Sequence, residues 1–333
     1  MKEREKGRRQ LSGSNREGGM DRVTIFGAGY VGATTAFYLA LSASLELTLV
    51  DVQEGKARGI ALDIAQSLPF AGSSSKVTGG EDPGLAAGSD LVIITAGNPR
   101  LPGMSRLDLT TRNVPIVSSI AREVAGSAPH AVVVVVTNPV DEMTYLAWKR
   151  GGFEETRIMG MAGVLDTSRL LYFLDNIGGL PPADVSAMVL GTHGDDMVPL
   201  LDWSRAGDRS IAEALPPETA DQIVARTRDG GAEVVSFLKT GSAYYAPAVS
   251  VGATALAILG DTGRVLPTSA YLRGQYGVEG IFLGVPAKLG RQGVTEILEL
   301  PLSAREMEAL QQSARGVKQR VSELGTVISD ESD

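Results

Sequence analysis

The sequence predicts an α/β protein in which a doubly wound parallel sheet is followed by an α+β domain. Three observations support this fold class. Short β-rich runs alternate with helically spaced apolar residues in the first half, a glycine-rich turn follows the first run, and turn-punctuated strands dominate the end of the chain. Strands that alternate with helices form βαβ units, whose strands lie parallel in one sheet.

The first half contains the strands and helices of such a sheet. The expected strands are 22–27, 46–51, 76–80, 90–97, 131–138 and 157–163, and the expected helices are 30–43, 55–68, about 105–128 and 141–151. The fifth strand, AVVVVVTN, is an almost continuous valine run. Such a run is typical of a central parallel strand that is buried on both faces.

The second half has a different pattern. We expect a strand at 185–191, a long helix at 218–238, strands at 263–274, 280–290 and 293–300, and a closing polar helix at 304–324. The three late strands predict an antiparallel meander. The predicted division is a basic extension 1–20, a nucleotide-binding domain 21–162, a substrate-binding domain 163–328 and an acidic tail 329–333.

Composition excludes several classes of protein. The chain of 333 residues carries a net charge of −8 and no cysteine. Thiolate nucleophiles, disulfides and Cys-ligated metals are therefore excluded, and an acidic chain does not favour a nucleic-acid binder. No run of 18 apolar residues exists to span a membrane. Residues 1–20 lack the apolar core of a secretory signal, so we expect a disordered extension and a cytoplasmic protein without a metal site.

The glycine-rich turn predicts a dinucleotide site. Gly27-Ala28-Gly29-Tyr30-Val31-Gly32 follows a strand and opens a helix, and Asp51 ends the next strand. Glycines in this pattern permit a tight turn and let the backbone approach a pyrophosphate, while the acidic residue binds a ribose hydroxyl. Asp51 repels a 2′-phosphate, which favours NAD over NADP. The alternative is a structural glycine turn in an unrelated α/β protein.

The two histidines have different surroundings. His130 precedes the valine strand and is expected in a solvated loop, whereas His193 lies between glycines after an apolar strand. Hydride transfer to a carbonyl needs a proton donor with a pKa near neutrality, and histidine suits this role. Asp166 and Arg169 are candidates to orient the imidazole and to bind a substrate carboxylate. Alternatively, Asp166 is a helix N-cap and Arg169 lies on a solvated face.

Taken together, these motifs resemble the lactate/malate dehydrogenase family, and within it the lactate-dehydrogenase-like malate dehydrogenases. The resemblance runs from Asp21 to Leu324 and rests on GAGYVG, ITAGNPRLPGMSR, VTNPVD, MAGVLDTSR and GTHGDDMVP in this order. It implies NAD as cofactor, reversible oxidation of (S)-malate to oxaloacetate, a place in the tricarboxylic acid cycle, and a homodimer or homotetramer.

The resemblance also implies roles for individual residues. Asp166 and His193 are expected to form a proton-relay pair, Arg169 to bind the C1 carboxylate, and Arg106 with Asn138 to contact the reacting C–O group. The expected cofactor-binding residues are Gly27, Ala28, Gly29, Tyr30, Val31, Gly32, Asp51, Asn113, Val136, Thr137 and Asn138.

Arg100 is the residue that selects the substrate in this interpretation. Lactate dehydrogenases carry glutamine at the matching loop position, and malate dehydrogenases carry arginine. A second substrate carboxylate needs a cation, and an unpaired buried charge costs about 3–5 kcal/mol. Leu101 and Leu107-Asp108 depart from the malate dehydrogenase pattern, but none of them bears a charge needed in the mechanism.

Three other functions remain as alternatives. A lactate dehydrogenase would prefer pyruvate to oxaloacetate. An NAD-dependent glycosidase typically recruits a Cys/His-bound metal, which a chain with no cysteine and two histidines fits poorly. A non-catalytic NAD-binding protein of the same fold predicts loss of the charged residues, yet Arg100, Arg106, Asp166, Arg169 and His193 are all present.

Overall fold

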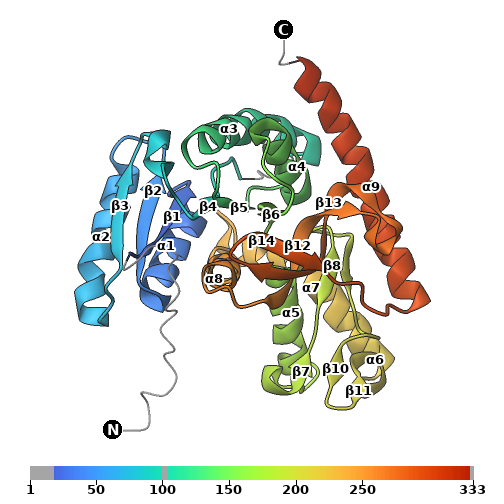
Figure 1. The fold of residues 1–333 in the computed structure, drawn as a ribbon. Helices are drawn as coiled ribbons and strands as arrows, with labels where there is room; N and C mark the ends of the chain where they lie inside the picture. Colours follow the sequence, from blue (N-terminus) through green and yellow to red (C-terminus); the bar gives the residue numbers. More distant parts are fainter. Residues whose placement is uncertain (1–18, 100–103, 331–333) are drawn as a thin grey trace.

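The computed structural model describes residues 19–99 and 104–330, with side chains described up to residue 325. The first half forms a parallel sheet with the strand order β3-β2-β1-β4-β5-β6 (Figure 1). Its strands are β1 (Asp21–Phe26), β2 (Leu45–Val50), β3 (Lys76–Gly80), β4 (Leu91–Ile94), β5 (Val132–Val135) and β6 (Ile158–Gly160). This order is that of the Rossmann fold, so the predicted doubly wound sheet is confirmed.

Helices cover both faces of this sheet. They are α1 (Tyr30–Ser42), α2 (Lys56–Ala71), α3 (Arg106–Ser127) and α4 (Val140–Gly151), with a short 3₁₀ turn at Pro83–Ala86. Because successive side chains of a strand point to opposite faces, Ile93 packs with α1 and α2 whereas Ile94 packs with α3 and α4. Both isoleucines are fully buried, and each such burial contributes about 1.5–3 kcal/mol.

The second half extends the same sheet with antiparallel strands. Ser269 of β12 pairs with Gly160 of β6, and the order continues β12-β13-β8-β9 with β14 on β13. These strands are β8 (Val189–Gly191), β9 (Met197–Pro199), β12 (Arg264–Arg273), β13 (Glu279–Gly290) and β14 (Gly293–Ile297). The predicted meander is therefore confirmed as β12, β13 and β14.

The remaining elements are a small sheet and the helices that pack around this extension. A small sheet joins β7 (Val185–Ser186), β10 (Arg205–Ala206) and β11 (Arg209–Ser210), next to α6 (Ile211–Ala214). The helices are α5 (Gly163–Asn176), α7 (Pro217–Leu238), α8 (Tyr245–Leu259) and α9 (Ala304–Asp330), with short 3₁₀ turns at Pro182–Asp184 and Gln275–Gly277. Helix α9 runs along the outer side of the antiparallel strands (Figure 1).

The short elements β9, β10, β11 and α6 were not predicted, and two further segments differ from the sequence prediction. The single strand expected at 185–191 is wrong: β7 and β8 belong to different sheets. Helix α8 was not expected, because its sequence YAPAVSVGATALAIL is apolar on almost every side and has no clear period. A helix of this kind is stable when it is buried, and ten of its residues are buried.

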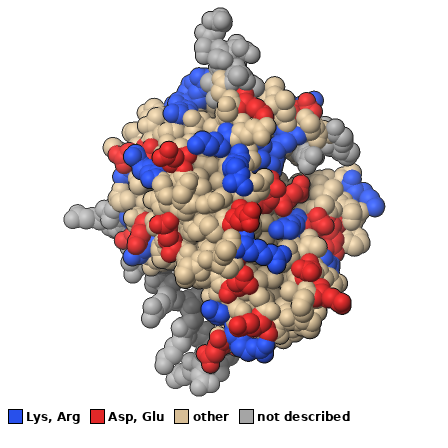
Figure 2. Space-filling model, turned by 90° about the vertical axis from the view of Figure 1, so that its right-hand side faces the viewer, with Lys and Arg blue, Asp and Glu red and all other residues tan. Residues whose placement is uncertain are grey.

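Within the described residues, no helix is long and apolar enough to cross a bilayer. On the face shown in Figure 2, Lys and Arg side chains are interspersed with Asp and Glu side chains. His130 is exposed before β5, as expected, and its carbonyl accepts a hydrogen bond from Arg157 Nη1 at 2.7 Å.

Candidate active site

The glycines of the turn between β1 and α1 differ in whether there is room for a Cβ atom. Gly27 has φ +100°, and a Cβ there would lie 2.6 Å from the Ala96 nitrogen. A Cβ on Gly32 would lie 1.9 Å from the Gly27 carbonyl oxygen, so both positions exclude a side chain. By contrast, no atom lies within 4 Å of a Cβ built on Gly29, the N-cap of α1. Open space at a helix N-terminus fits a pyrophosphate.

Asp51 closes this turn from the neighbouring strand. Its carboxylate accepts hydrogen bonds from the Ala28 nitrogen at 2.8 Å and the Gln53 nitrogen at 3.0 Å, and Lys56 Nζ lies 3.1 Å away. Burial opposes ionisation of Asp51, but the two N–H groups and Lys56 together lower its pKa. An ionised carboxylate here suits a ribose hydroxyl. The sequence analysis missed Lys56, because no spacing rule distinguishes it from other lysines at a helix start.

Asn113 connects the ends of β4 and β5. It is fully buried; its Oδ1 accepts from the Asn98 nitrogen at 2.7 Å, and its Nδ2 donates to the Asn138 carbonyl at 2.8 Å. Thr137 is also buried, and its hydroxyl donates to the Ala96 carbonyl at 2.7 Å. Val136 is partly buried, and Asn138 is exposed. Direct contact of these residues with NAD stays a prediction.

The glycine turn also contacts the second half of the chain through an aromatic pair. The side chain of Tyr30 is 72% exposed, and its ring stacks on Tyr244 with 5.1 Å between centroids. Tyr244 packs in turn against Tyr245, the first residue of α8. Tyr30 was expected only at the cofactor, and its contact with Tyr244 was not predicted, since the proximity of residues more than 200 positions apart has no local signal.

His193 and Asp166 form a hydrogen-bonded pair. Asp166 lies in the first turn of α5, whose N-cap is Ala162, and His193 follows β8. The imidazole Nδ1 lies 3.0 Å from Asp166 Oδ1 and 2.9 Å from Oδ2. The Asp166 side chain is only 2% exposed. The alternative in which Asp166 is a helix N-cap is therefore wrong.

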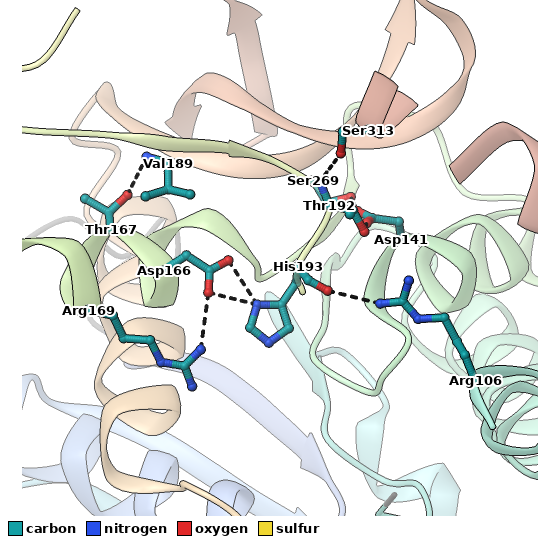
Figure 3. Close-up of polar contacts among 10 residues, drawn as sticks. All are labelled: Arg106, Asp141, Asp166, Thr167, Arg169, Val189, Thr192, His193, Ser269 and Ser313. Atoms are coloured by element: carbon teal, nitrogen blue, oxygen red, sulfur yellow. Dashed lines mark hydrogen bonds and ion pairs between the residues drawn. The ribbon is translucent and has the colours of Figure 1, made fainter. Parts of the chain in front are cut away.

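Two arginines flank this pair on opposite sides (Figure 3). Arg169 Nη1 lies 3.4 Å from Asp166 Oδ1, and its side chain is 14% exposed, so it does not lie on a solvated face. Arg106 is the first residue of α3 and donates through Nη2 to the His193 carbonyl at 3.3 Å. Three elements thus bring an imidazole, a carboxylate and two guanidinium groups together.

Glycines of α7 make room for Arg169. A Cβ on Gly230 would lie 3.1 Å from Arg169 Cδ, and one on Gly231 would lie 3.4 Å from Arg169 Nη2. The two glycines therefore let α7 approach the guanidinium stem closely. The sequence analysis missed them, although consecutive glycines inside a predicted helix are a signal that another group packs there.

The charges around His193 set its proton affinity. Burial lowers the pKa of His193, but the charge and the hydrogen bond of Asp166 outweigh it, so the net pKa is raised above 6.5. Burial also lowers the pKa of Arg169, against the attraction of Asp166. An imidazole of this kind is poised to exchange a proton near neutral pH. Because Nδ1 faces Asp166, Nε2 is the nitrogen that remains for a substrate.

One predicted site residue lies outside the described residues. Arg100, the expected substrate selector, belongs to residues 100–103, which also include Leu101 and the Pro102-Gly103 pair. Its predicted role therefore rests on the sequence.

The cofactor cradle, formed by Gly27 to Gly32 with Asp51, and the His193–Asp166 pair occur in one protein. Together they define the class of the nicotinamide-dependent dehydrogenases. Hydride transfer requires both a bound nicotinamide and a proton donor. The residues present fit this cofactor, because the N-terminus of α1 is open at Gly29 and Asp51 is ionised beside it.

Comparison with known proteins agrees with this class and narrows it. Residues 21–160 match the lactate/malate dehydrogenase NAD-binding domain, and residues 163–326 match the α/β C-terminal domain of the same family. The chain is 47% identical to malate dehydrogenase of Bacillus subtilis strain 168 over 299 residues, which cover 89% of this chain and 96% of that protein.

Solved structures give the same result. Malate dehydrogenase of Cryptosporidium parvum matches with a TM-score of 0.89 and 37% identity, over 92% of this chain and all of that one. Lactate dehydrogenase of Cryptosporidium parvum, solved with lactic acid and NAD, matches with a TM-score of 0.88 and 38% identity, over 92% and 98% of the two chains. The chain belongs to the lactate/malate dehydrogenase family, and its first domain binds NAD.

Proposed function

We propose that this enzyme catalyses the reversible NAD-dependent oxidation of (S)-malate to oxaloacetate, a reaction of the tricarboxylic acid cycle. The single observation that carries the chemistry is the buried Asp166 carboxylate bonded to His193 Nδ1 between two arginines. The choice of malate is supported by relatives that are named malate dehydrogenase at 45–47% identity.

The protein's residues have distinct roles in this mechanism. The glycine turn and Asp51 would hold NAD, which would supply the acceptor for the hydride of malate C2. His193 Nε2 takes the hydroxyl proton, and Asp166 stabilises the resulting imidazolium through Nδ1. The planar fork of Arg169 holds the C1 carboxylate. In the reverse direction, Arg106 polarises the carbonyl oxygen, and exclusion of water strengthens that interaction.

Specificity for a dicarboxylate rests on Arg100. A cation at the distal end of the substrate pairs with the second carboxylate of oxaloacetate. With pyruvate bound, the same cation would be enclosed without a partner. That arrangement costs about 3–5 kcal/mol, which corresponds to about two to four orders of magnitude in rate preference.

The test is the rate of NADH oxidation with oxaloacetate and with pyruvate, measured for the wild type and for Arg100→Gln. We expect the wild type to prefer oxaloacetate, and the variant to lose most of that preference. Arg122→Gln, which removes an exposed arginine on α3, is the matched control and should keep it. An unchanged preference in Arg100→Gln would contradict the proposed role of this arginine. A wild-type preference for pyruvate would favour a lactate dehydrogenase.

We also propose that the chain divides into domains at 21–162 and 163–328, and that it works in the cytoplasm as a homodimer or homotetramer. The two matched family models support the division. Exposed apolar side chains on two helices support self-association: Leu62 and Phe70 on α2, and Phe237 and Leu238 on α7. Exposed apolar surface commonly marks an interface where several large side chains contribute to it. Sedimentation equilibrium tests the oligomer, and a monomer at micromolar concentration would contradict it.

A further inference from the structure

A second buried carboxylate lies on the opposite side of His193 from Asp166. Asp141 is fully buried in the first turn of α4. Its Oδ2 accepts a hydrogen bond from Thr192 Oγ1 at 2.6 Å, and its Oδ1 accepts one from Ser269 Oγ at 2.5 Å. Figure 3 shows this group beside the histidine, which directly follows Thr192 in the chain. The proposed mechanism does not use Asp141.

Thr192 is held from several elements at once. Besides its bond to Asp141, its backbone nitrogen donates to Ser313 Oγ of α9 at 2.9 Å. Its hydroxyl also accepts from Arg320 Nη2 of the same helix at 3.5 Å. The side chain and the N–H group of Thr192 are therefore both fixed, and Thr192 is 2% exposed.

The chain around His193 needs such an anchor. Gly191 has φ +81° and Gly194 has φ +140°, so glycines in the left-handed region stand on both sides of the Thr192-His193 pair. Glycine permits many backbone conformations and does not by itself fix one of them. A polar anchor at Thr192 supplies the constraint that the glycines lack. An ångström of misplacement at a reacting group costs up to about a hundredfold in rate.

We propose that Asp141 is a positioning residue for the proton relay: by binding the Thr192 hydroxyl, it fixes the backbone that presents His193 to the substrate. This inference rests on the proposed function. Residues that hold a catalytic group in place from behind commonly determine how precisely it is oriented.

The charge of Asp141 also acts on the imidazole. Burial and the neighbouring Glu142 raise the pKa of Asp141 to about 6, against the hydrogen bonds of Ser269 and Thr192 and the charge of Arg320. Glu142 is itself ion-paired with Arg320 of α9. Within the described part of the chain, the other charged groups around His193 are Asp166 and Arg169 from α5 and Arg106 from α3. Ionised Asp141 adds to the causes that raise the pKa of His193.

The experiment combines two variants with a spectroscopic readout. Asp141→Asn removes the charge and keeps an acceptor for Thr192, whereas Thr192→Val removes the anchored hydroxyl and keeps the shape. Since the chain has two histidines, His130→Gln leaves a single imidazole for titration by NMR. Steady-state kinetics with oxaloacetate and NADH are measured in the same His130→Gln background.

We expect kcat to fall about tenfold to a hundredfold in Thr192→Val, with KM for oxaloacetate and NADH binding unchanged. Asp141→Asn should also lower kcat, and it should move the His193 titration to lower pH. Thr24→Val is the matched control, because Thr24 is an equally buried threonine whose hydroxyl bonds to Ser89 at 2.8 Å, away from the relay. It should keep the wild-type kcat.

Wild-type kcat and an unmoved His193 titration in the two variants would overturn the inference. If Asp141→Asn does not fold, Thr192→Val alone decides, since its kcat must fall relative to Thr24→Val. A different result would contradict the proposed function: a wild-type protein that does not reduce oxaloacetate. The NMR titration needs no turnover, so it still reports on Asp141 in that case.

Discussion

The cofactor cradle and the proton relay are built on different principles. The cradle uses residues close in sequence, Gly27 to Gly32 with Asp51, and depends on missing side chains and backbone N–H groups. The relay joins Arg106, Asp166 and His193 from distant segments and depends on charge. Cofactor binding by the cradle should therefore weaken when atoms are added to its glycines. Catalysis by the relay should fall when its charges are removed.

Among the tests that compare these two regions, removal of Arg169 is expected to have the largest effect. In Arg169→Leu, the substrate carboxylate loses its charged partner, which costs about 2–5 kcal/mol, or about 30-fold to 5,000-fold in kcat/KM for oxaloacetate. NADH binding should not change, because Arg169 lies beside Asp166 of the relay and not at the glycine turn. Stopped-flow NADH binding and steady-state rates check both statements, with Arg122→Leu as the exposed control. Weakened NADH binding in Arg169→Leu would contradict the separation of cofactor binding from catalysis between the two regions.

Two of the cradle glycines, Gly29 and Gly27, should respond to alanine in different ways. Gly29→Ala places a methyl group in open space, so the free protein should keep its Tm while NADH binding weakens about fivefold to a hundredfold. Gly27→Ala strains a φ of +100° and clashes with Ala96, so it should lower Tm. Thermal unfolding and NADH fluorescence titration measure the pair. Equal behaviour of the two variants would show that Gly29 does not face the cofactor.

Asp166→Asn should shift the pH dependence of both directions. Protonated His193 serves oxaloacetate reduction, so kcat/KM for reduction falls as pH rises through the His193 pKa, while malate oxidation rises. Asp166 raises that pKa above 6.5, and its loss should move both limbs to lower pH. Full pH profiles in the two directions check this. A reduction limb that stays in place in Asp166→Asn would mean that another group titrates.

The smallest effect concerns stability and Asp141. The folded pKa of about 6 exceeds the ordinary value of 3.8, so the folded state binds this proton more tightly than the unfolded state. Wild-type stability contributed by this group is thus fully present below pH 3.8 and is lost as pH rises through about 6. The Tm of Asp141→Asn relative to the wild type should therefore rise between these pH values. If the difference in Tm between Asp141→Asn and the wild type stays constant from pH 3.8 to about 6, Asp141 does not titrate in this range.

The sequence predicted the cradle and the main strands because their signals are local. GAGYVG after an apolar run and before a helix specifies a strand, a turn and a helix within a dozen residues. Asp51 follows at the end of the next strand, and parallel pairing of β1 with β2 brings it to the turn. The order of motifs identified His193, Asp166 and Arg169 through resemblance, whereas spacing alone left Asp166 open to an N-cap role.

What the sequence did not reveal depends on packing between distant segments. The contacts of Thr192 with Ser313 and of Gly230 with Arg169 form only when the second half folds. The contact of Tyr30 with Tyr244 forms only when the two halves pack together. Helix α8 lacked a polar face, so no period marked it. Asp141 was missed because an aspartate at a helix start is ordinarily read as favourable to the helix dipole, and nothing local shows that it is buried.

The central claim is that His193 is the proton donor and acceptor, and the most direct test compares His193→Asn with His130→Asn. Both variants remove one imidazole, but only His193 is bonded to Asp166. The account predicts that oxaloacetate reduction falls on the order of 10³-fold in His193→Asn with NADH affinity retained, while His130→Asn stays at the wild-type rate. Wild-type turnover in His193→Asn would contradict it.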